Sequence, residues 1–98
     1  MVEVIKSATF AAWLDGLTDL KARARIQLRL DRLALGNAGD AKRLTKAVSE
    51  LRIDYGPGYR VYFTRKGPLV VILLCGGDKR TQDADIKEAI RIAANWGK

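Results

Sequence analysis

Three extended segments follow one another in the second half of the chain, and two short turns separate them. Residues 49–55 and 59–65 alternate apolar and polar side chains, which is typical of strands with one buried face. Residues 69–75 form an unbroken apolar run, as expected of a central strand covered on both faces. The turns read Gly56-Pro57-Gly58 and Lys66-Gly67-Pro68. This pattern predicts a largely antiparallel sheet at the centre of the fold.

Residues 19–35 alternate in part as a strand would, but their composition and length favour a helix. Ala, Leu, Arg, Lys and Gln dominate the segment, and they are good helix formers. On a helix one stripe is cationic, and the opposite side is mainly apolar. The cationic stripe is Lys21, Arg25, Arg29 and Arg32, and the apolar side holds Leu20, Ala24, Ile26, Leu30 and Leu33. The stripe suits phosphate or an acidic partner, or it is a solvated helix face.

Four shorter or terminal elements complete the prediction. Residues 2–5 and 43–48 are expected as short strands, and Ser7 as the N-cap of a helix that ends near Gly16. Residues 81–96 are expected as a helix with Thr81 as N-cap. The face of this helix expected on the sheet is Ile86, Ala89, Ile90 and Ala93. The fold class is therefore α+β: a mainly antiparallel sheet of four to five strands, two N-terminal helices and a C-terminal helix.

Length and composition set the limits of the chemistry. The 98 residues suit a single domain over residues 1–98, with 48% hydrophobic and 30% charged residues. The single Cys excludes a disulfide scaffold, and the absence of His excludes His-based catalysis and His metal ligands. The carboxylates show no metal-ligand spacing, so neither a metal nor a cofactor is expected. Net charge +7 favours a polyanionic partner, or it serves solubility alone.

The chain shows neither a signal peptide nor an apolar stretch of the roughly 20 residues that a membrane helix requires. We therefore expect a cytoplasmic protein that does not engage a membrane.

The hairpin of residues 49–65 holds the first candidate site. If its apolar side chains share the core face, then Arg52, Arg60 and Tyr62 lie together on the other face. Arginine binds phosphate in a bidentate manner, and an exposed tyrosine stacks on bases, so this face suits RNA. The alternative is a solvated face on which Arg52 pairs with Asp54 or Glu50.

The second candidate site is the segment after the apolar strand, residues 76–82. It joins a strand end to a helix start, which is a common place for anion binding, and it contributes Lys79, Arg80 and Gln82. The alternative is a turn with solvated charges. Cys75 is expected as a buried strand residue and not a nucleophile, because no His accompanies it. Trp13 and Trp96 are expected in the core or at a partner contact.

Several motifs resemble a known family. The stretch SELRIDYGPGYRVYF, the apolar strand and then CGGDKRTQDADIKEAI are similar to the "addiction module killer protein" branch of HigB/RelE-type toxins, in the RelE/ParE superfamily. The pieces NAGDAKRL and WLDGL resemble the same branch, so the likeness covers nearly the whole chain. It implies a RelE-like fold and the toxin half of a bacterial type II toxin–antitoxin pair. Many such toxins cut mRNA in the ribosomal A site without a metal.

The resemblance also implies site residues. Arg52 matches the basic position of the first hairpin strand, Arg60 the arginine of the family's GYR element, and Lys79 the basic residue after the last strand, with Arg80 beside it. These cations would stabilise the charge that develops on the phosphate when the ribose 2′-OH attacks it.

The chain departs from the family at the residues that move the proton. RelE has a second basic residue where Asp54 stands, and a tyrosine near its C-terminal helix where this chain reads Asp83-Ala84-Asp85-Ile86. HigB-type enzymes use His, which is absent here. Lys79, Tyr62 or an aspartate of the last helix are the candidate proton carriers, and the sequence does not choose among them.

Two other functions stay open at this point. ParE toxins share the fold and inhibit DNA gyrase without catalysis, so gyrase is the alternative partner. A non-toxic member would act only as a repressor subunit with its antitoxin. The expected partners are otherwise a small antitoxin with a helix-turn-helix domain, the ribosome and mRNA.

Overall fold

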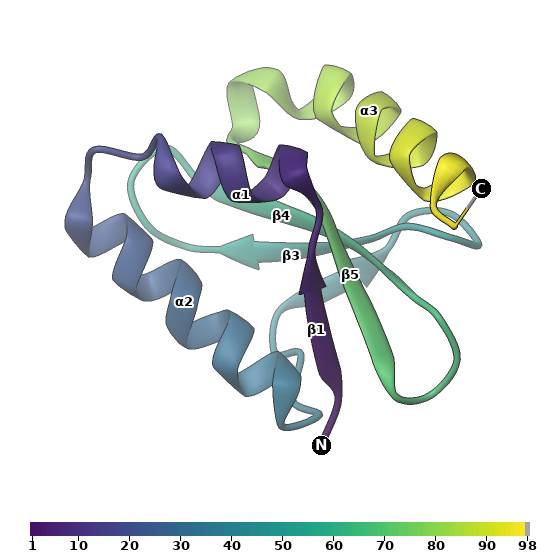
Figure 1. Cartoon of the computed structure of the whole chain (residues 1–98). Helices are drawn as coiled ribbons and strands as arrows, with labels where there is room; N and C mark the ends of the chain where they lie inside the picture. Colours follow the sequence, from purple (N-terminus) through teal and green to yellow (C-terminus); the bar gives the residue numbers. More distant parts are fainter. Residues whose placement is uncertain (98) are drawn as a thin grey trace.

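The computed structural model describes residues 1–97, which form one open sheet and the helices that cover it (Figure 1). The mixed α+β prediction is confirmed: the described residues hold five strands and three α-helices. In chain order the elements are β1 (Glu3–Lys6), α1 (Ala8–Asp15), α2 (Leu20–Ala34), β2 (Ala41–Arg43), β3 (Ser49–Ile53), β4 (Tyr59–Arg65), β5 (Val70–Gly77), a 3-10 turn (Lys79–Thr81) and α3 (Gln82–Asn95).

The strands lie in the order β1-β5-β4-β3-β2. β1 pairs with β5 in parallel, and the other neighbours pair antiparallel, so the sheet is mainly antiparallel as expected. In the central hairpin Arg52 lies opposite Arg60, and Arg60 in turn lies opposite Gly77 of β5. This register brings the turn end of the hairpin next to the start of the 3-10 turn.

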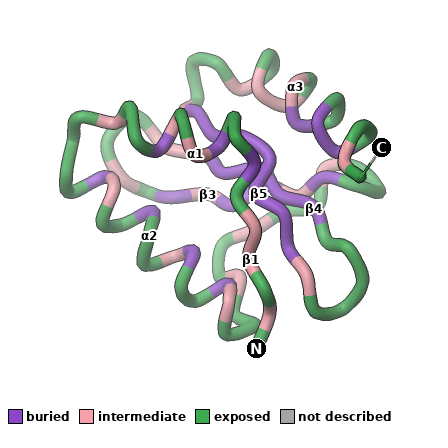
Figure 2. Tube along the Cα trace, viewed as in Figure 1, coloured by how far each residue is buried: buried purple, intermediate pink, exposed green. Residues whose placement is uncertain are grey.

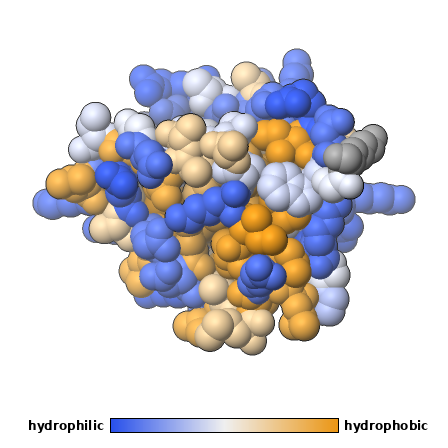
Figure 3. All heavy atoms as spheres, viewed as in Figure 1, coloured by the Kyte–Doolittle hydropathy of each residue, from blue (hydrophilic) through white to orange (hydrophobic). Residues whose placement is uncertain are grey.

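Helices cover both faces of the sheet, and each face has its own apolar core (Figures 1 and 2). Phe10 and Leu14 of α1 and three side chains of α2 pack on one face. Ala89, Ile92 and Ala93 of α3 pack on the other face. β5 is buried along most of its length, as its unbroken apolar run predicted. In Figure 3 apolar side chains gather around the edge strand β1, where Val4 and Ile5 are half-buried.

The expected starts of the first two helices are confirmed. Ser7 Oγ accepts a hydrogen bond from the Phe10 amide at 3.0 Å and donates one to the Leu74 carbonyl at 2.7 Å. The Asp19 carboxylate caps α2 by accepting from the amides of Lys21 and Ala22. Thr81 precedes α3, but its hydroxyl bonds the Asp85 carboxylate and makes no capping bond to the helix backbone.

Some details of the prediction are wrong. The short strand expected at residues 43–48 lies at Ala41–Arg43, because the chain turns after Arg43 and the Thr45 hydroxyl accepts from two amides of that turn. On α2 the side chains of Leu20 and Ala24 are exposed, while Ile26, Leu30 and Leu33 are buried as expected. On α3 the residue Ile90 is 42% exposed, and Ile92 takes the buried position.

Trp13 is half-buried and packs within the fold. Its ring centre lies 5.7 Å from that of Phe10 and 6.2 Å from that of Tyr59. The backbone of Gly76 lies directly under the indole. Trp96 packs against the α3 core. Both tryptophans therefore serve the core, one of the two roles expected for them.

Among residues 1–97 no helix has the length and the apolar character needed to cross a lipid bilayer.

We predict that Gly76→Ala destabilises the protein by about 1–3 kcal/mol, the usual cost of overpacking a core. A Cβ at this position would collide with the indole of Trp13. Urea unfolding followed by circular dichroism measures the change. The control is Gly16→Ala, whose Cβ would lie 3.3 Å from a backbone oxygen at the end of α1, and which should change stability by less than about 0.5 kcal/mol. Equal losses in the two variants would contradict the packing argument.

Candidate functional site

A charged hollow of about 430 Å³ lies at the turn end of the β3–β4 hairpin. Residues from the loop before β2, from the hairpin and from the 3-10 turn line it. They are Asp40, Arg52, Asp54, Gly56, Pro57, Gly58, Arg60 and Lys79. The three residues expected to be catalytic, Arg52, Arg60 and Lys79, therefore come together in one place, although Lys79 is distant from the other two in sequence. We call this place the hairpin hollow.

Arg60 is the most buried cation of the hairpin hollow, with 9% of its surface exposed. Its Nη1 donates to the carbonyls of Gly58 and Tyr59, both at 3.2 Å. Its Nε lies 3.8 Å from Glu50 Oε2, and within residues 1–97 this buried N–H has no hydrogen-bond partner. This Nε faces the buried carboxylate and not the hollow. Nη2 makes no hydrogen bond within residues 1–97, so the guanidinium retains donors for an anion.

A buried carboxylate lies beside Arg60. Glu50 is 3% exposed and accepts a hydrogen bond from Gln82 Nε2 at 2.7 Å. Gln82 was expected to bind substrate, but in the structure its amide holds Glu50 and ties the start of α3 to β3. Sequence reasoning gave Glu50 no role beyond a possible partner of Arg52. The antiparallel register that places Glu50 opposite Tyr62 puts it on the face that α3 covers.

Arg52 pairs with Asp40, and neither of the acids considered for it from the sequence is its partner. Its Nε and Nη2 donate to Asp40 Oδ1 at 3.1 and 2.7 Å. Arg29 of α2 holds the same region, because it donates to the carbonyl of Arg52 at 2.5 Å and to those of Ala38 and Asp40 at 3.0 and 3.2 Å. Arg29 therefore joins α2 to the loop before β2, and its guanidinium is committed to the backbone.

Lys79 reaches the hollow across Gly58. A Cβ on Gly58 would lie 3.1–3.2 Å from three carbons of the Lys79 side chain, and the backbone there has φ +82°, which favours glycine. The glycine thus gives the lysine stem room to lie along the turn. Lys79 itself is exposed, and the described part of the chain places no carboxylate within ion-pair distance of its ammonium.

The expectation that Tyr62 is an exposed stacking platform is wrong. Its side chain is fully buried in the core beneath α3. Burial, and then the nearby Glu50 carboxylate, raise the pKa of its phenol. Tyr62 therefore can neither stack on a base nor carry protons to the hollow, because α3 covers the sheet face that was expected to be solvated.

The remaining predicted residues do not line the hairpin hollow. Arg80 pairs with Asp78 at 2.9 Å, and its hydrogen bonds lower the pKa of that carboxyl. It lines a neighbouring hollow of about 520 Å³ that shares Lys79. On α2, Arg25 and Arg32 line a small hollow together with Asp54, and the Arg25 guanidinium lies 4.7 Å from the Tyr55 ring centre. Lys21 is exposed near the start of α2.

Cys75 is 3% exposed, and its Sγ donates to the Asp85 carbonyl at 3.3 Å. Burial, followed by the charges of Asp85 and Glu88, raises the pKa of this thiol to about 12. The expectation that Cys75 is a buried strand residue is confirmed. Over residues 1–97 the Cys, Asp and Glu side chains form no group of three or more that could hold a metal ion.

The open five-stranded sheet with its three helices, counted over the described residues, is compatible with a RelE-like fold. Residues 12–96 match the model of the Gp49-like phage-derived protein family (DUF891), and the chain belongs to this family, which is associated with RelE-type toxins. An uncharacterized protein of Haemophilus influenzae strain Rd is 48% identical over 96 residues, which is 98% of this chain and 97% of that protein.

We predict that Glu50→Ala destabilises the protein by about 3 kcal/mol or more, because it leaves the buried Arg60 guanidinium without its countercharge. Urea unfolding measures the loss. Glu88→Ala removes the carboxylate of an exposed pair with Arg91 and should cost less than about 1 kcal/mol. Similar costs for the two variants would argue against a structural role for the buried carboxylate.

We predict that Cys75 resists thiol reagents in the folded protein. A pKa of about 12 leaves very little thiolate at pH values near 8, and the side chain is also buried. The rate of reaction with Ellman's reagent should be at least about a hundredfold lower in the native protein than in concentrated urea. A native rate close to the unfolded rate would show an accessible thiol.

Proposed function

We propose that the protein is the toxin of a type II toxin–antitoxin system and acts as a ribosome-dependent mRNA endonuclease. The observation that carries the proposal is the buried, incompletely paired Arg60 in a hollow that also holds Arg52 and Lys79. Phosphate is the natural ligand of such a cluster, since arginine and lysine both bind it. Membership of a family associated with RelE-type toxins supports the same conclusion.

The reaction uses a nucleophile that the RNA itself supplies, and on this proposal it requires neither a metal nor a cofactor. The ribose 2′-O forms a bond to the adjacent phosphorus while the bond from phosphorus to the 5′-oxygen breaks. The products are a 2′,3′-cyclic phosphate and a free 5′-OH. Arg60, Arg52 and Lys79 stabilise the negative charge on the phosphate oxygens, and their positions on short, well-packed elements hold the strand in line for attack.

Two protons must move in this reaction, and the hairpin hollow contains a group for each. Asp54 lines the hollow, and its carboxylate has no hydrogen bond or ion pair to other side chains of residues 1–97. It accepts the proton of the 2′-OH. The Lys79 ammonium gives a proton to the departing 5′-oxygen. This assignment replaces Tyr62, which is buried, and the aspartates of the last helix. Asp85 is bonded to Thr81, and Asp83 lines the neighbouring hollow instead of the hairpin hollow.

The partners follow from this proposal. The ribosome presents the mRNA, and a small antitoxin with a helix-turn-helix domain neutralises the protein. Inhibition of DNA gyrase is the competing function, and it does not need the three cations of the hairpin hollow to act on phosphate.

We predict that Lys79→Ala lowers mRNA cleavage about 10²–10³-fold, the usual effect of removing one group that stabilises an oxyanion. Lys79 is exposed, so the variant should fold normally. Arg60→Ala should have at least as large an effect, and Asp54→Asn should slow cleavage and change its pH dependence. Primer extension on mRNA from induced cells, and on translating ribosomes in vitro, measures cleavage within codons.

The matched control is Lys87→Ala, which removes an exposed lysine of α3 outside the hairpin hollow and should cleave as the wild type does. Intact mRNA together with an SOS response on induction would favour gyrase inhibition. Normal growth on strong induction without antitoxin would favour a non-toxic repressor subunit.

A further inference from the structure

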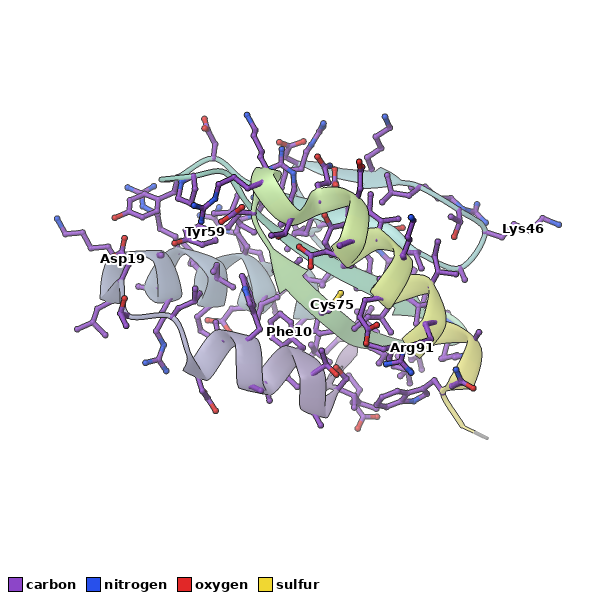
Figure 4. All side chains as sticks on the ribbon, turned by 90° about the horizontal axis from the view of Figure 1, so that it is seen from above. Phe10, Asp19, Lys46, Tyr59, Cys75 and Arg91 are labelled. Carbon is purple, nitrogen blue, oxygen red and sulfur yellow. The ribbon has the colours of Figure 1, made fainter. Side chains whose placement is uncertain are left out.

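A further basic hollow lies at the end of the β3–β4 hairpin that is opposite its turn. Its volume is about 250 Å³, and its lining residues are Arg43, Lys46, Ala47, Ser49 and Arg65. We call it the distal basic hollow. Figure 4 shows Lys46 at the end of the molecule opposite Tyr59, with its side chain directed outward. None of these residues lines the hairpin hollow.

The loop that carries this hollow is held in place by its own hydrogen bonds. Arg43 donates from Nε to the Thr45 carbonyl at 3.2 Å and from Nη2 to the Lys46 carbonyl at 3.1 Å. The Thr45 hydroxyl accepts from the amides of Ala47 and Val48 at 3.1 and 3.0 Å. Arginine has five N–H donors, so Arg43 retains donors for a ligand after these two bonds. The cations are thus presented by an ordered turn.

The chemistry of the lining selects a phosphate backbone. The two segments that meet here, residues 41–49 and 63–71, contain five Lys and Arg residues and no Asp or Glu. The lining also lacks an aromatic side chain on which an unpaired base could stack. Cations without stacking platforms contact the sugar–phosphate backbone of a base-paired nucleic acid, where the bases are already stacked on one another.

We infer that the distal basic hollow binds the phosphate backbone of a base-paired nucleic acid, and that it gives the protein a second contact beside the hairpin hollow. The choice of RNA over DNA rests on the proposed function. Arg60 and Arg65 are five positions apart on β4, so the two hollows are separated by roughly 16 Å along the strand. This exceeds the Debye length of about 8 Å at physiological salt, so each hollow contributes nearly independently to binding.

The test compares two double variants that remove the same charge. Lys46→Gln with Arg65→Gln alters the distal basic hollow, and Lys6→Gln with Lys87→Gln alters exposed lysines outside every hollow described above. Fluorescence anisotropy measures binding to an RNA duplex of about 20 base pairs, to a DNA duplex of the same sequence and to polyglutamate, over about 50–200 mM salt. All four substituted side chains are exposed, and urea unfolding checks that both variants fold.

We expect the distal variant to bind the RNA duplex more weakly. The negative slope of log K against log salt should become shallower by about two, one for each lost phosphate contact. The control variant should change the slope by much less. Equal losses of affinity in both variants would show an effect of net charge alone and overturn the inference, as would weakened binding of polyglutamate alone. Weakened binding of the DNA duplex alone would overturn the choice of RNA. Weaker binding of both duplexes by the distal variant, or of the RNA duplex alone, supports a site for the phosphate backbone. If the wild type cleaves no mRNA but the RNA-binding difference remains, the proposed function fails and the distal site stands.

Discussion

Burial of β5 on both faces is the constraint from which the rest of the structure follows. The strand is almost wholly apolar, so water must be excluded from both of its sides. α1 and α2 cover one face and α3 covers the other, and β1 and β4 satisfy its backbone hydrogen bonds. Because the chain must leave β5 and return as α3, the 3-10 turn between them falls at the turn end of the hairpin. Lys79 reaches the hairpin hollow for this reason.

The charges of the hairpin hollow differ in how strongly the protein compensates them. Arg52 has an exposed partner in Asp40, and Arg60 has a buried partner in Glu50. Lys79 extends along Gly58 and has solvent around its ammonium. This gradation places a preoriented guanidinium beside an exposed ammonium. The first suits recognition of a phosphate in a defined orientation, and the second suits a group that must give up a proton.

Much of the fold could be predicted from the sequence, because the helices and strands follow from local patterns of residues. The alternation in the hairpin, the apolar run of β5, the cap at Ser7 and the helical composition of residues 19–35 all predicted what the structure contains. The grouping of Arg52, Arg60 and Lys79 came from the family resemblance, and the structure brings these side chains together. Their catalytic role is a proposal.

The errors concern contacts between distant parts of the chain. Tyr62 was assigned to a solvated face because arginines precede it at alternate positions. Its partner across the sheet is Cys75, however, and a strand covered on both faces implies that its neighbour is covered too. Several contacts of the site join segments whose proximity depends on the register of the sheet and the packing of α2. They are the bonds of Gln82 to Glu50, of Arg52 to Asp40 and of Arg29 to three carbonyls. No periodicity within one segment reports such pairs.

The parallel pairing of β1 with β5 has a consequence for how the protein is made. The Ser7 hydroxyl bonds the carbonyl of Leu74, and β1 pairs with residues 70–73, so the N-terminal strand has no partner until most of the chain has been synthesised. Contacts of such large sequence separation form late, since the entropy of closing the loop opposes them. Lys79 follows β5 by only two residues. The edge of the sheet and the hairpin hollow are therefore completed together, late in synthesis, and a chain truncated before β5 would lack both.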